Sequence, residues 1–109
     1  MAYIQLREGE LERIQKTYPD KIPIFITKST KDSLPDIKKH KFLVPSRVTM
    51  AEFQLTIRKW LVLTPEQAIF IFIGNSLPMS GRTVGELYND HKGPDGVLRV
   101  TYASENTFG

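Results

Sequence analysis

The residue types that most often carry out catalysis are scarce in this chain of 109 residues, and they are not grouped. There is no cysteine, so thiol catalysis, disulfides and cysteine-held metals are excluded. The two histidines, His40 and His91, are far apart in the sequence and have no metal-ligand spacing, so we interpret both as surface residues. Gly74, Gly81 and Gly85 match neither a P-loop nor a dinucleotide-binding fingerprint. We therefore expect no enzyme activity, no cofactor and no metal site.

The remaining group that could react is the carboxylate of Gly109. It ends a polar stretch, residues 103–109, that follows the last predicted strand. A tail with an unbranched end suits the narrow channel of an activating or conjugating enzyme. The alternative is that Gly109 only marks where the chain was cut, and composition alone favours that alternative.

Composition and charge limit the class of protein. With 40% hydrophobic and 25% charged residues, the chain has the proportions of one globular domain. Its net charge of +3 comes from residues 1–50, where ten Lys or Arg face six Asp or Glu. So small an excess indicates a solvated surface rather than a nucleic-acid or lipid-binding one. The sequence has no apolar run of membrane-spanning length and no signal-peptide core, and its lack of cysteine fits a reducing compartment, so we expect a cytoplasmic protein.

One stretch has the pattern of a short strand followed by an amphipathic helix. Phe42, Leu43 and Val44 favour a strand, and Pro45 ends it and favours a sheet edge, so we predict that one side of this strand is unpaired. A T-x-x-E capping box over residues 49–52 starts a helix near residue 50. One arc of this helix carries the following apolar residues: Met50, Phe53, Ile57, Trp60 and Leu61. The seam between the edge strand and the helix is a candidate peptide groove.

Hydrophobic periodicity and turn residues predict the other elements. A helix is predicted over residues 4–18, because apolar residues recur on one side until Pro19 prevents continuation. A strand over residues 22–28 directs its isoleucines toward the core helix, while Pro23 and Phe25 face the opening helix. The remaining predictions are a loop over 29–40, a turn over 64–67, a buried strand over 69–73, a short helix from the second capping box at 83–86 to before 93–94, and a strand over 97–102.

This order predicts an α+β fold with a four-stranded mixed sheet and a central helix on one face. It is compatible with a ubiquitin-like β-grasp roll that carries an additional N-terminal helix. The expected organisation is an N-terminal helical extension packed on the core over residues 1–20, a ubiquitin-like domain over 21–102 and a flexible conjugation tail over 103–109.

Several blocks of the sequence, in the right order and spacing, resemble the ubiquitin-like autophagy modifier family, which includes the GABA-receptor-associated protein and microtubule-associated light chain three. These blocks are YPDKIP at 18–23, KFLVPS at 41–46, AIFIF at 68–72, LY at 87–88 and YASENTFG at 102–109. The resemblance covers nearly the whole chain. It implies the fold described above, with one of the family's two extra N-terminal helices missing or rudimentary.

The resemblance also implies a function. Members of the family are joined through a terminal glycine, here Gly109, to phosphatidylethanolamine on autophagosomal membranes. The implied partners are a processing cysteine protease, activating and conjugating enzymes, that membrane, and cargo receptors and adaptors. Receptors and adaptors bind through short motifs, an aromatic residue followed three places later by an aliphatic one, which add as a strand to the edge strand. The chain is expected to be monomeric in solution, and cytoplasmic until lipidation places it on the autophagosome.

The binding residues are carried over by resemblance at matching positions. The aromatic pocket resembles one formed by Glu10, Ile14, Pro23, Phe25, Lys41, Leu43 and Val97. The aliphatic pocket resembles one formed by Phe42, Val44, Pro45, Val48, Phe53, Thr56 and Ile57. Lys39 and Lys41 are expected to contact acidic residues of the motif.

Three positions depart from the family pattern. Phe25 replaces a smaller aliphatic residue, Thr56 an apolar one and Trp60 a basic one, so motif preference is expected to differ. Two other functions stay open at this point: an adaptor that binds peptides without being conjugated, and, more remotely, a nucleic-acid-binding domain built on Lys38, Lys39, Lys41 and Phe42. We expect no nucleic acid, because Phe42 belongs in a groove beside a helix.

Overall fold

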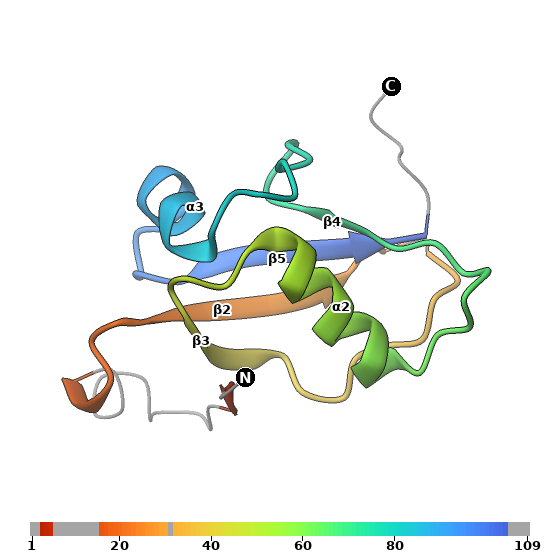
Figure 1. The fold of residues 1–109 in the computed structure, drawn as a ribbon, viewed down its shortest axis with the longest axis horizontal. Helices are drawn as coiled ribbons and strands as arrows, with labels where there is room; N and C mark the ends of the chain where they lie inside the picture. The colour runs from red at the N-terminus through yellow and green to blue at the C-terminus, as the bar shows by residue number, and fades with distance from the viewer. Residues whose placement is uncertain (1–2, 6–15, 31, 105–109) are drawn as a thin grey trace.

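The structure is a computed structural model that describes residues 3–5, 16–30 and 32–104. Its elements are β1 (Ile4–Gln5), β2 (Lys21–Lys28), β3 (Lys41–Pro45), α2 (Met50–Leu61), β4 (Phe70–Phe72), α3 (Val84–His91) and β5 (Leu98–Ala103). The strands of the described residues form one five-stranded sheet in the order β1-β3-β2-β5-β4, and α2 crosses one face of it (Figure 1). The α+β class, the mixed β-grasp sheet and the central helix are therefore confirmed.

The sheet is mixed because its two central strands are parallel. β2 pairs parallel with β5 and antiparallel with β3, and β4 is antiparallel to β5. A parallel pair requires a long crossover, which here contains β3, α2, β4 and α3. Ile24 lies at the centre of the sheet, opposite Phe42 on one side and Leu98 on the other.

The N-terminal prediction was wrong at the beginning of the predicted helix. Residues 4–5 form β1, a fifth strand, instead of starting a helix, and β1 pairs antiparallel with β3. β3 therefore has a neighbour on both sides, and the sheet edge that the sequence assigned to it belongs to β1. The physical reason is that the open backbone of β3 offers hydrogen bonds that a local helical period cannot reveal. At the other end of the predicted helix, Lys16 and Thr17 are helical, as predicted. Residues 6–15, between these two ends, lie outside the described residues.

The main core lies between α2 and the isoleucine face of β2. Ile24 and Ile26 are almost fully buried and pack in one cluster with Phe53 and Ile57 of α2, as the alternation predicted. Trp60 departs from the predicted core arc of the helix: it is 38% exposed and lies at the open edge, where its ring stacks on Phe42 at 4.6 Å between ring centroids.

Both predicted capping boxes are present, and they fix the beginnings of the two helices. In α2 the Glu52 N–H donates to Thr49 Oγ1 over 3.2 Å, while the Thr49 N–H donates to Glu52 Oε1 over 3.1 Å. Thr83 and Glu86 repeat this arrangement in α3. The two caps are joined by a β-bridge between Thr49 and Thr83, so the start of α2 is held against the start of α3. No helix among the described residues has the length and apolarity needed to span a membrane.

Candidate functional site

The residues predicted to form the aliphatic pocket gather between β3 and α2. Those buried in the core cluster are Phe42, Val44, Val48, Phe53 and Ile57. Pro45 is buried at the end of β3, and Thr56 is half-buried on the outer side of α2. Truncating Phe53 to alanine would cost about 3–5 kcal/mol of unfolding free energy, as for other buried aromatic residues. These side chains therefore form the buried floor of the seam between β3 and α2, and the accessible surface of that seam is made by others.

Two aromatic residues lie over this floor. Tyr3 stacks on Phe53 with ring centroids 6.2 Å apart and planes inclined by 15°. Its ring also meets Trp60 edge to face at 5.4 Å. Since Trp60 in turn stacks on Phe42, the aromatic pair covers the seam between β3 and α2.

The hydroxyl group of Tyr3 is an exception to good polar pairing. Its oxygen is buried, and no hydrogen bond reaches it from the described residues. Burial raises the pKa of Tyr3, the Glu52 carboxylate adds to the rise and the Thr56 hydroxyl opposes it. The Thr56 hydroxyl donates its own proton to the Glu52 carbonyl oxygen over 3.1 Å. The ring contacts of Tyr3 therefore favour its docked position, and the burial of its unpaired hydroxyl group opposes that position.

The described members of the predicted aromatic pocket lie near one another on and beside the sheet. Pro23 pairs with Leu43 and Phe25 with Lys41 across β2 and β3, and Val97 immediately precedes β5. Pro23 and Leu43 are buried, whereas Lys41 is exposed. Glu10 and Ile14 lie outside the described residues. On the other side of β3, Leu43 has Ile4 of β1 as its partner.

Phe25, the residue expected to narrow this pocket, is half-buried. Its ring lies 5.7 Å from the ring of His40, centroid to centroid, at a tilt of 33°. His40 is held in turn through Nδ1, which donates to the Ile26 carbonyl oxygen over 2.7 Å. Phe25 therefore has a fixed neighbour on the side of the basic loop.

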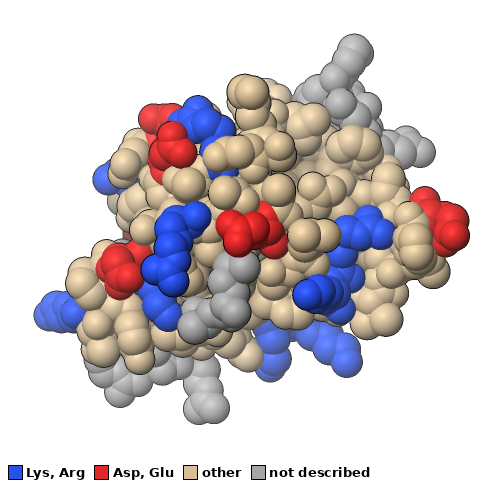
Figure 2. Space-filling model, viewed as in Figure 1, with Lys and Arg blue, Asp and Glu red and all other residues tan. Residues whose placement is uncertain are grey.

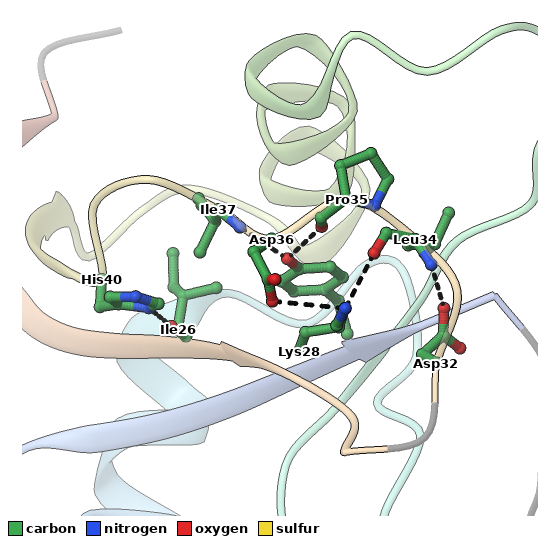
Figure 3. Close-up of polar contacts among 9 residues, drawn as sticks. Ile26, Lys28, Asp32, Leu34, Pro35, Asp36, Ile37 and His40 are labelled. Atoms are coloured by element: carbon green, nitrogen blue, oxygen red, sulfur yellow. Dashed lines mark hydrogen bonds and ion pairs between the residues drawn. The ribbon is translucent and has the colours of Figure 1, made fainter.

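The loop that carries the predicted acid-binding lysines is anchored by Tyr102, at the end of β5. The Tyr102 hydroxyl donates to the Pro35 carbonyl oxygen over 2.7 Å and accepts from the Ile37 N–H over 2.9 Å (Figure 3). Burial raises the pKa of Tyr102, with the Ile37 hydrogen bond opposing the rise, so the phenol is protonated and able to donate at neutral pH. Lys28 adds a hydrogen bond to the Leu34 carbonyl oxygen and an ion pair with Asp36.

A cavity of about 460 Å³ opens between this loop, β1 and the end of α2. Its lining includes Tyr3, Gln5, Ile37, Lys39, Trp60 and Leu61. Lys39 and Lys41 are both exposed, and Lys39 lies at the cavity. The charged residues of the lining are Lys38, Lys39 and Asp36, and Asp36 is paired with Lys28. The cavity thus combines apolar walls with two lysines that could meet a carboxylate beside an apolar side chain.

The start of the C-terminal tail is tied to the same loop. Asp32 Oδ2 accepts from the Ser104 backbone N–H over 2.6 Å and from its hydroxyl over 3.0 Å, while Asp32 Oδ1 accepts from the Leu34 N–H. Burial acts to raise the pKa of Asp32, but these hydrogen bonds outweigh it and hold the pKa below its ordinary value. Gly109 itself lies outside the described residues.

Sequence reasoning missed Tyr3 as part of the site and treated Trp60 as core. A signal for Tyr3 was available, because an aromatic residue followed by the β-branched Ile4 favours a strand over a helix. Trp60 gave no such signal, since helical periodicity places it on the core arc. Among the described residues there is also no group of three or more acidic or histidine side chains that could hold a metal ion.

Comparison with known proteins accounts for this architecture. A family model described as autophagy protein Atg8, ubiquitin-like, matches residues 6–109. The chain is 47% identical to autophagy-related protein 8e of Arabidopsis thaliana, over 94% of this chain and 84% of that protein. It is 46% identical to autophagy-related protein 8 of Mycosarcoma maydis, over 94% of this chain and 87% of that protein.

The chain belongs to the Atg8 family. It is accordingly a ubiquitin-like modifier of autophagy, as the resemblance predicted. The match to the Atg8 family model begins at residue 6, whereas the alignment with autophagy-related protein 8d of Arabidopsis thaliana, 42% identical, spans 97% of this chain and 88% of that protein and includes Ile4 and Gln5. On the face that α2 covers, basic and acidic side chains of the described residues are intermixed (Figure 2). That mixture does not favour a nucleic-acid surface on this face.

Proposed function

We propose that this chain is joined through the carboxylate of Gly109 to the amine of phosphatidylethanolamine on autophagosomal membranes. The observation that carries the proposal is that the Atg8 family match continues to residue 109, while β5 ends at Ala103. Residues 104–109 thus follow the last strand and, if fully extended, would span about 20 Å. That length is enough to bring Gly109 into the channel of a conjugating enzyme without moving the sheet.

We further propose that β3 and its two sets of flanking residues recruit cargo receptors and adaptors. The proposed ligand is a short motif with an aromatic residue and, three places later, an aliphatic one. The motif's backbone pairs with β3, and its two anchors enter on either side of that strand. Phe25, Lys41 and Leu43 serve the aromatic anchor, and the groove over Phe53 and Thr56 serves the aliphatic one. Acidic residues beside the motif meet Lys39 and Lys41.

The remaining parts of the proposal follow from conjugation. The chain is a substrate of a processing cysteine protease and of activating and conjugating enzymes, and it catalyses no reaction itself. It is monomeric in the cytoplasm and moves to the autophagosome membrane when lipidated. Residues 1–20 form an extension, residues 21–102 the ubiquitin-like domain and residues 103–109 the tail that the enzymes handle.

The test is reconstitution of the conjugation reaction. The chain is incubated with the activating and conjugating enzymes, ATP and phosphatidylethanolamine liposomes, and its mass is then measured. We expect the full chain to gain the mass of the lipid and a variant that lacks Gly109 to gain nothing. The Gly109 deletion should leave the urea unfolding midpoint unchanged. Lipid attachment to the deletion variant would contradict the role of Gly109.

A second candidate is an adaptor that binds motif peptides but is never conjugated. The cavity beside β1 and the end of α2 supports this hypothesis as much as the first. The reconstituted conjugation reaction distinguishes the two hypotheses. An unconjugated adaptor would keep its original mass under conditions in which an Atg8 relative, used as a positive control, gains the lipid.

A further inference from the structure

We propose that residues 3–5 are an internal ligand of the β3 edge, and that partner peptides must displace them to bind. The proposal rests on the proposed peptide binding at β3 and concerns how that binding is regulated. β1 occupies the outer side of β3, and the sheet order leaves β3 no other free side. The backbone that a motif peptide would use is therefore already paired.

The backbone pairing of β1 is what a docked peptide would provide. Ile4 lies opposite Leu43 and Gln5 opposite Phe42, in an antiparallel arrangement. β1 is only two residues long and is added at the edge of the sheet, as a docked peptide strand would be. An incoming strand can take its place without disturbing the pairing of β3 with β2.

The side chains of this segment also lie against both proposed anchor sites, the aromatic one and the aliphatic one. Successive strand residues point to opposite faces of a sheet. Tyr3 lies on the α2 side, where its ring covers Phe53 and contacts Trp60. Ile4, the next residue, pairs with Leu43, a predicted member of the aromatic pocket. One short segment thus covers both proposed anchor sites.

The segment is held loosely enough to be displaced. Tyr3 and Ile4 are only half-buried, and Gln5 is exposed. The buried Tyr3 hydroxyl has no hydrogen-bond partner among the described residues, so its burial opposes the contacts that the ring makes. The strands β2, β3 and β5 and the helix α2 form the core with Tyr3 packed only against its margin.

The segment has the spacing of the proposed motifs but not their placement. Tyr3 is followed three places later by Leu6, an aromatic and aliphatic spacing, yet Tyr3 lies over Phe53, in the site proposed for the aliphatic anchor. The segment therefore blocks the site without reproducing the side-chain order of a motif.

The first test compares affinities for one synthetic peptide, three glutamates followed by a Trp-x-x-Leu core. The Tyr3→Ala variant of the full chain removes the aromatic contact, and Ile4→Pro disrupts the pairing with β3. Met79→Ala is the control, because it shortens an apolar side chain that is 77% exposed and lies outside β1 and the cavity. We expect Tyr3→Ala and Ile4→Pro to lower the Kd about five- to tenfold, as when a mostly closed site becomes open, and Met79→Ala to leave it unchanged.

The outcomes separate this inference from the function on which it rests. If the wild type binds the peptide and neither Tyr3→Ala nor Ile4→Pro binds it more tightly, the proposed function stands and the internal ligand is refuted. If neither the wild type nor the variants bind, peptide binding at this edge fails, and the inference falls with it. Tighter binding by both variants, each shown to be folded by circular dichroism, supports displacement.

The second test follows the segment itself by backbone chemical shifts of the isotopically labelled wild type. In the free protein, Ile4 and Gln5 should give shifts typical of a strand. At saturation with the peptide they should move to values of an unstructured chain, while Ile71 of β4, at the opposite edge of the sheet, keeps its strand shifts. Strand shifts retained by Ile4 and Gln5 in the saturated complex would overturn the proposal.

Discussion

Tyr102→Phe is expected to lower stability far more than the loss of one hydroxyl group at the surface would. The Tyr102 side chain is fully buried, and its hydroxyl is bonded to both Pro35 and Ile37. Ile37 is 6% exposed, so its N–H would be left buried without a partner, at a cost of about 1–3 kcal/mol. The Pro35 carbonyl can turn to water, because Pro35 is exposed, and its lost bond adds about 0.5–1 kcal/mol.

Together these losses predict a decrease of about 2–3 kcal/mol in the free energy of unfolding, or roughly 10–20 °C in Tm. Urea denaturation followed by circular dichroism measures the decrease. Tyr88→Phe is the matched control, since its hydroxyl makes one hydrogen bond, to the Gly96 carbonyl oxygen over 2.9 Å, and Tyr88 is half-buried. The control should lose only about 1 kcal/mol. If Tyr102→Phe loses no more than Tyr88→Phe, the loop over residues 32–40 is not anchored as described.

Further predictions concern the tail anchor and the peptide site. Asp32 has a lowered pKa when folded, so its ionised form stabilises the fold above the ordinary value of 3.8 and loses this effect as the pH falls through the lower folded value. The stability difference between wild type and Asp32→Asn, measured by urea denaturation, should thus shrink from pH 7 to pH 3, and an equal difference at both would contradict the assignment. Replacing Lys39 and Lys41 together by Glu should weaken binding of an acidic motif peptide, by about 0.2–1 kcal/mol for each lost exposed pair and more for the reversal, and added salt should reduce the effect. A Kd insensitive to both salt and substitution would remove the lysines from the site. Phe25→Ile should improve binding of Trp-anchored peptides relative to Phe- and Tyr-anchored ones, because it opens the first pocket, and an unchanged order of the three Kd values would show that Phe25 does not gate it.

The parts of the fold that sequence could predict are those that local chemistry determines. The T-x-x-E boxes at Thr49 and Thr83 satisfy backbone groups within their own first turns, so the helix starts were found within a residue. Alternation in β2 identified Ile24 and Ile26 as core-facing, since the period of a strand is a property of its own backbone.

The parts that sequence could not predict depend on distant partners. Tyr3 and Ile4 are in an extended segment because β3 is beside them, some forty positions later in the chain, and no local period records that neighbour. Trp60 has the spacing of a core residue but lies where α2 passes the sheet edge, which follows from the crossing of the helix over β3. The loop over residues 32–40 is ordered by Tyr102 from the opposite end of the sequence.

The central claim is that β3 is the surface at which partner motifs dock, and amide spectra of the labelled chain test it most directly. The chain is titrated with the glutamate-rich Trp-x-x-Leu peptide until the signals stop changing. The largest shifts should fall on the amides of Lys41, Phe42 and Leu43, with smaller ones at Phe25 and on the outer side of α2. Large shifts confined to the far side of the sheet, at Ile71 of β4 and Leu77, with Phe42 and Leu43 unmoved, would contradict the claim.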